Sequence, residues 1–109
     1  MKEQVLTVLN ELRNITQQIT NDTEQEQFES LPLLIQKRDS GIQQLKSFNA
    51  NEFRDAASGV VDSQIKSAFE MLNTHSHTMQ ETMTRKSKSL LSTLSSLQQR
   101  RYYTQEVSK

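Results

Sequence analysis

The chain contains no cysteine, one proline and two glycines in 109 residues. Without cysteine it forms no disulfide and carries out no thiol chemistry, which fits a reducing compartment. So few glycines and prolines exclude a β-protein built from short strands and tight turns. No stretch approaches the roughly 20 apolar residues of a membrane span, and residues 1–4 turn polar without an apolar signal core. We therefore expect a cytoplasmic protein without membrane insertion.

Apolar residues recur at three- and four-residue intervals along most of the chain, which predicts an all-α fold. Only 33% of the residues are hydrophobic, so we expect a thin core in a single domain over residues 1–109. The architecture expected is an antiparallel three-helix bundle with a long C-terminal helix, or a four-helix bundle if that helix folds back. The predicted helices cover residues 2–21, 24–47, 51–84 and 88–106. The predicted core comprises Leu9, Leu12, Phe28, Ile35, Ile42, Ile65 and Leu72.

The sequence allows two interpretations of where the second helix starts. Thr23 and Glu26 have the spacing of a capping box, which would begin the helix there. Pro32 then interrupts the helix, and a kink at proline costs about 3 kcal/mol. Alternatively, Ser30 is the N-cap and Pro32 lies in the tolerant first turn. We favour the kinked helix, because Phe28 stays in register with the apolar positions that follow.

The last fifty residues, from Val60 onward, contain neither glycine nor proline. One helix of that length would span roughly 75 Å at about 1.5 Å per residue, and the two preceding helices are too short to cover it. Thr84 to Ser89 would be the hinge if the segment folds back, because it combines poor helix formers with three positive charges. We expect part of the apolar face to lack an internal partner.

A run of leucines marks that face. Leu90, Leu94 and Leu97 lie on one side of a helix, and a helical partner would dock on such a side. The predicted partner-binding residues are Leu90, Leu94, Leu97, Tyr102 and Tyr103. Burial of the leucines in a fourth helix is an equally weighted alternative.

Charge differs between the two parts of the chain although the net charge is zero. Residues 1–62 hold six basic and ten acidic side chains, and residues 63–109 hold seven basic and three acidic ones. This division favours antiparallel packing of the first part of the chain against the second, and it can steer a partner. The basic residues near Tyr102 and Tyr103 form small groups separated by leucine and serine, so we expect a solvated face and no nucleic-acid partner.

No constellation of catalytic or ligating residues stands out. His77 and Glu81 have the i, i+4 spacing that can hold a metal on one helical face, but no third ligand is near. Phosphate-binding glycine loops and nucleophile elbows do not occur in the sequence. We expect no enzymatic activity, no cofactor and no metal site.

Three groups of residues resemble the FliT-type flagellar export chaperones, with the FlgN-type chaperones as a related family. The first group is an aromatic followed by aliphatic and basic positions: Phe28, Leu31, Leu34, Lys37, Arg38, Ile42 and Leu45. The second is Asp62 with Ile65. The third is the ending formed by Leu90, Leu94, Leu97, Gln98, Gln99, Arg100, Arg101, Tyr102 and Tyr103. Phe28 stands where the family usually has tryptophan, and Pro32 interrupts a helix that usually lacks proline.

This resemblance implies a chaperone that holds a flagellar subunit, foremost the filament-cap protein, before its export. It also implies contact with the export apparatus. The alternative is a self-associating helical protein, as a coiled-coil homodimer or a secreted hairpin of the WXG100 type, although the chain has no tryptophan for the Trp-X-Gly turn.

Overall fold

The computed structural model describes residues 2–55 and 57–107, with side chains through Leu97. It holds three α-helices, α1 (Lys2–Glu24), α2 (Leu31–Ser47) and α3 (Ser63–Val107). Two short 3-10 helices, η1 (Phe28–Ser30) and η2 (Ala50–Phe53), lie in the connections. The predicted all-α class is therefore confirmed.

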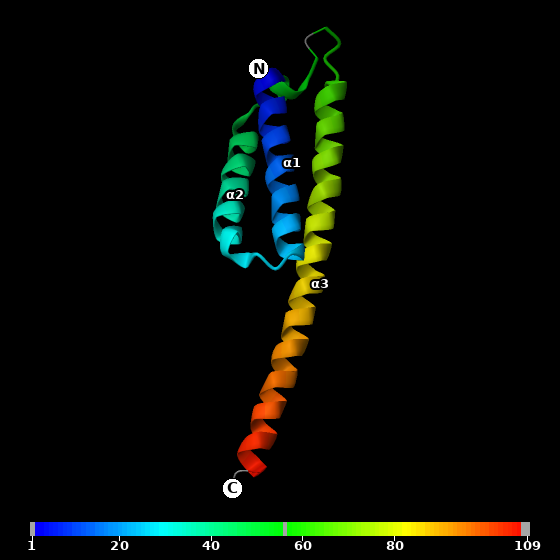
Figure 1. The fold of residues 1–109 in the computed structure, drawn as a ribbon. Coiled ribbons are helices and arrows are strands. Elements are labelled where there is room, and N and C mark those ends of the chain that lie inside the picture. The colour runs from blue at the N-terminus through cyan, green and yellow to red at the C-terminus, as the bar shows by residue number, and fades with distance from the viewer. Residues whose placement is uncertain (1, 56, 108–109) are drawn as a thin grey trace.

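The three helices form a bundle in which α1 packs against both of the others. α2 runs antiparallel to α1, and the chain then crosses over the end of the bundle so that α3 runs parallel to α1 (Figure 1). Side-chain contacts fix this parallel register: Arg13 Nη1 donates to Met71 Sδ at 3.8 Å, and Gln17 Nε2 lies 3.3 Å from His75 Nε2. Both pairs are 58 residues apart in sequence, as parallel helices in constant register require.

The buried core lies between α1 and α3. Its buried apolar residues are Val5, Val8, Leu9, Leu12, Ile19, Ile65, Leu72 and Met79. Ile42 and Leu45 of α2 pack against this cluster while staying half-buried. The core is thin because α2 contributes no fully buried residue.

Two residues expected in the core lie outside it. Phe28 and Ile35 are each 38% exposed, so their assignment to the core is wrong. Phe28 belongs to η1, before α2 begins, and is therefore not on the inward face of that helix. Ile35 lies at the margin of the inward face of α2, on which Leu34 and Arg38 are half-buried. Leu9, Leu12, Ile65 and Leu72 are buried, and Ile42 is half-buried.

The second helix does not begin at Glu24, and the favoured kinked helix is wrong. α1 continues to Glu24, and Thr23 Oγ1 donates to the Ile19 carbonyl at 2.7 Å instead of capping a new helix. Glu26 adopts a left-handed conformation with φ 59°, which turns the chain. α2 starts after Ser30, with Pro32 in its first turn, where a missing amide hydrogen costs nothing.

The third helix begins at residue 63 rather than 51. Asn49 caps only η2, through its side chain and the Asn51 amide. The chain then forms a turn, in which Gly59 has φ 69°, closed by an isolated β-bridge between Arg54 and Val61. Asp62 is the N-cap of α3, because its Oδ1 accepts from the amides of residues 64 and 65 at 2.9 and 3.2 Å.

From residue 63 to residue 107, α3 is continuous, so the expected hinge segment 84–89 lies within one helix. The molecule measures 79 Å along its long axis and 20 Å across. α3 runs on alone past the ends of α1 and α2 (Figure 1). A helix of 45 residues explains this length, since the paired helices have 23 and 17 residues.

Candidate functional site

Three leucines of α3 form an exposed apolar face, which we call the leucine seam: Leu90, Leu94 and Leu97. Their exposed fractions are 42%, 53% and 49%. Leu91 is 62% exposed and widens the face at one side. Large exposed apolar residues that occur singly need no explanation, but a row on one helical face is typical of a docking surface.

The leucine seam continues the face of α3 that packs against α1 inside the bundle. Ile65, Leu72 and Met79 are buried on that face at intervals of seven residues. Leu90 follows Met79 by eleven residues, which is about three helical turns, so it returns to the same side of the helix. The face of α3 that α1 covers therefore extends past the end of α1, and neither α1 nor α2 reaches that part of α3 (Figure 1).

Polar contacts fasten α3 to the bundle just before the seam. Arg85 forms an ion pair with Glu24, and Lys86 Nζ lies 3.7 Å from Glu26 Oε1. One turn earlier, Thr82 is buried at the end of the core. These contacts join the base of the free part of α3 to the turn between α1 and α2.

Arg38 of α2 forms hydrogen bonds with both of the other helices. Its Nε donates to Thr16 Oγ1 at 3.2 Å and its Nη2 donates to Ser76 Oγ at 3.1 Å. One half-buried side chain of α2 thus contacts both α1 and α3. Sequence reasoning placed Arg38 among the family-like residues but did not assign it this bridging position.

The two tyrosines predicted to bind a partner, Tyr102 and Tyr103, lie in α3. Their side chains fall outside the described residues. The structure therefore places three of the five predicted partner-binding residues, all of them on one exposed face.

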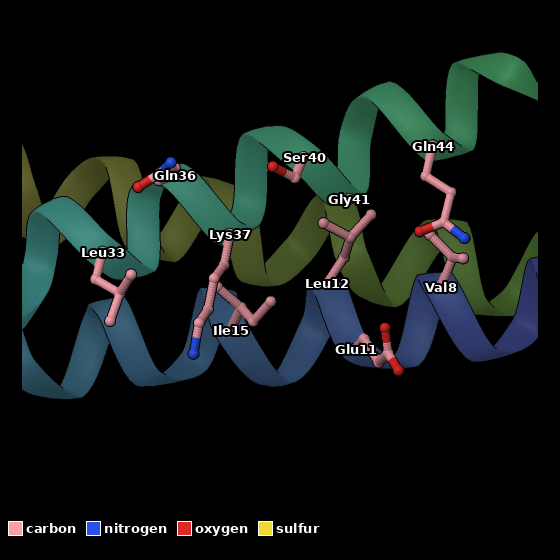
Figure 2. A pocket seen from close by; sticks show the side chains of 10 residues that line it. All are labelled: Val8, Glu11, Leu12, Ile15, Leu33, Gln36, Lys37, Ser40, Gly41 and Gln44. Atoms are coloured by element: carbon pink, nitrogen blue, oxygen red, sulfur yellow. The ribbon is translucent and has the colours of Figure 1, made fainter.

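A second apolar feature, which the sequence did not predict, lies between α1 and α2. It is a groove of about 440 Å³, shown in Figure 2. Apolar lining residues include Val8, Leu12, Ile15 and Leu33, and Lys37 crosses it. The groove is narrow near Gly41, because a Cβ at that position would lie 2.7 Å from Leu12 Cδ2.

The ion pairs among the described residues each join two side chains. His77 Nε2 lies 2.9 Å from Glu81 Oε1 on an exposed surface. Among the described residues, no group of three or more histidines and carboxylates is placed to hold a metal ion. At the opposite end, the Lys2 ammonium 3.0 Å from Asp62 lowers the pKa of that carboxyl, helped by the amides of Ile65 and Gln64 and opposed by burial.

In the described part of the chain, no helix has the length and apolar character needed to cross a bilayer. Comparison with protein-family models, curated proteins and solved structures finds no match for this chain.

Proposed function

We propose that this protein holds an amphipathic helix of a client protein on the leucine seam, as a stoichiometric binder rather than an enzyme. The observation that carries the proposal is the continuity of the seam with the core-facing side of α3. A face that buries Ile65, Leu72 and Met79 against one helix is shaped to take a second helix farther along. The client helix would lie beyond the end of α1, in line with it.

The free energy gained by burying the leucine seam suits reversible binding of a client. Full burial of a leucine contributes roughly 1.5 to 3 kcal/mol, and each leucine of the seam is about half exposed, so each has about half of that left to gain. Three leucines then contribute a few kcal/mol, whereas a micromolar complex requires about 8 kcal/mol. A client helix must therefore also contact Leu91 and the more distant part of α3.

We further propose that the client is a flagellar subunit, the filament-cap protein first, and that the protein acts in the cytoplasm before export. The support is the resemblance of the residues from Phe28 to Leu45, and of the leucine-spaced ending, to the FliT-type chaperones. In such a role the fixed bundle would present the seam, and the export apparatus would be the second partner.

The test is binding of the purified filament-cap protein from the same organism, measured by isothermal titration calorimetry. Leu94→Asp places a charge in the middle of the seam and is expected to weaken binding at least 100-fold, with unchanged helicity by circular dichroism. Leu33→Asp is the matched control, since Leu33 is 57% exposed and lies on α2 away from the seam.

Wild-type affinity in the control and loss in Leu94→Asp support the proposal. Equal binding by Leu94→Asp and wild type would exclude the seam as the client site. Failure of the wild-type protein to bind the filament-cap protein would exclude that client.

A further inference from the structure

α2 differs from the other two helices in how little of it is buried. Among the described residues, the buried apolar side chains of the core all belong to α1 or α3, and α2 contributes none. The inward positions of α2, which include Leu34, Ile42 and Leu45, are only half-buried. Leu33 and Ile35 of the same helix are 57% and 38% exposed. Because burial of apolar surface is the main stabilising contribution, α2 is held less tightly than α1 and α3 hold each other.

The polar contacts differ in the same way. Ion pairs join α1 to α3 near both ends of α1, Lys2 with Asp62 and Glu24 with Arg85. In the described part of the chain, no ion pair joins α2 to another helix, and its hydrogen bonds to α1 and α3 come from Arg38. Exposed ion pairs contribute little, so the difference in burial remains the main reason why α2 is weakly attached.

Both ends of α2 are nevertheless anchored. Before the helix, Ser30 Oγ donates to Asp22 Oδ2 at 2.5 Å. After it, the ring of Phe48 lies edge-on to that of Phe53 with centroids 6.4 Å apart, and the Phe53 ring lies 5.9 Å from that of Phe69 in α3. A rigid α2 therefore cannot swing away from α1 about one end. It can leave α1 only by losing its helical structure between the two anchors.

Separated from α1, this segment has little to keep it helical. α2 has 17 residues, and isolated helices of up to about 12 to 15 residues are marginal in water even with the best helix-forming residues. Gly41 in its interior lowers the helix propensity further. Contact with α1 therefore supplies most of the stability of α2, and the contact and the helix are lost together.

We propose that α2 unfolds locally, between residues 31 and 47, while α1 and α3 remain paired. α2 is then a cover that opens and closes over one side of the core. Opening exposes Val8 and Leu12 of α1, which line the groove beside α2 (Figure 2). The leucine seam is unaffected, because it lies on α3 beyond the end of α2 (Figure 1). The inference is therefore independent of the proposed function.

Native-state hydrogen exchange of the full chain, followed residue by residue by NMR, tests the inference. We expect protection factors for residues 35–46 of α2 at least about 100-fold lower than those for residues 8–19 of α1 and 65–79 of α3. Low urea concentrations should accelerate exchange in α2 much less than in α1 and α3, because local opening exposes less surface than global unfolding. A smaller difference in protection, or the same urea dependence in all three helices, would overturn the inference.

A substitution between α1 and α3 gives a second test. Met79 is buried on the face of α3 that packs against α1, so Met79→Ala weakens their pairing without touching the contacts of Arg38 or Gly41. We expect protection in α1 and α3 to fall about 10-fold or more. Protection in α2 should change by less than about 3-fold, since α2 opens while α1 and α3 stay paired. Gln80→Ala, at the exposed neighbouring position, is the matched control and should leave all three helices unchanged.

Equal loss of protection in all three helices of Met79→Ala would overturn the inference, because it would show that the bundle opens only as one unit. If Met79→Ala does not fold, the exchange measurement on the wild-type protein decides alone.

Discussion

Gly41 of α2 lies directly against Leu12 of α1, so close that an added Cβ would be 2.7 Å from Leu12 Cδ2 and 3.2 Å from Leu12 Cγ. Gly41 therefore sets how near α2 approaches the core helix. A glycine inside a helix costs about 1 kcal/mol relative to alanine. Its presence here is explained by this contact, because Leu12 is buried in a packed core and cannot move freely.

Gly41→Ala is expected to lower the free energy of unfolding by about 1 kcal/mol, since an overpacking cost of about 1 to 3 kcal/mol exceeds the gain in helix propensity. Urea unfolding of wild type and Gly41→Ala measures this difference in the free energy of unfolding. Ser40→Ala, at the exposed neighbouring position, is the control and should be neutral or slightly stabilising. In a Leu12→Ala background the clash is absent, so Gly41→Ala should become stabilising. Stabilisation of the otherwise wild-type protein by Gly41→Ala would contradict the close contact.

The pairing of Lys2 with Asp62 predicts a pH dependence of stability. The pKa of Asp62 is lowered from 3.8 in the folded protein, so the charged pair stabilises the fold above that value. The contribution is lost as the pH falls through the lower folded pKa. Asp62→Asn keeps a good N-cap for α3 and removes the charge. The stability difference between wild type and Asp62→Asn should be largest at neutral pH and shrink below about pH 4.

Thermal unfolding followed at several pH values measures that difference. A difference that stays constant from neutral pH down to about pH 3 would show that the Lys2 pairing contributes nothing through charge. Asp62→Ala, which removes both the cap and the charge, should be less stable than Asp62→Asn at every pH.

The contacts that Arg38 makes with α1 and α3 predict a loss of stability when this side chain is shortened. Arg38→Ala removes two hydrogen bonds from a charged donor and should cost about 1 to 2 kcal/mol, less than for a fully buried group. Lys37→Ala, at the exposed adjacent position, should stay within about 0.5 kcal/mol of wild type. Equal effects of the two substitutions in urea unfolding would contradict the bridging role.

The long helix was predictable because its apolar spacing and its lack of glycine and proline persist to residue 107. Its start was not, because Phe53, Val60 and Val61 imitate helical spacing. In the structure Phe53 belongs to η2 and packs near Phe48 and Phe69, and Val60 and Val61 are exposed in a turn. Gly59 was the signal for that turn.

The candidate site also has one feature that the sequence predicted and one that it did not. The seam was predictable from local spacing and from the lengths of the helices, both of which the sequence contains. The groove beside Gly41 was not, because it depends on how α2 lies on α1. The start of α2 was predicted wrongly because the spacing of Glu26 from Thr23 suits a capping box. In the structure the chain reverses there, and Glu26 adopts a left-handed conformation.

α3 runs straight past the bundle and leaves its leucines uncovered by the rest of the same chain. Because the protein has no native cysteine, Gln4→Cys with Ser96→Cys permits clean spin labelling at two exposed positions. Pulsed dipolar electron resonance, on labelled protein diluted in unlabelled protein, then gives the distance within one chain. Residue 4 of α1 is level with residue 62, because the two helices are offset by 58 residues. Residue 96 lies 34 residues farther along, so a straight α3 predicts about 50 Å at about 1.5 Å per residue. A helix folded back at residues 84–89 would give about 25 Å, and that result would contradict an uncovered leucine seam.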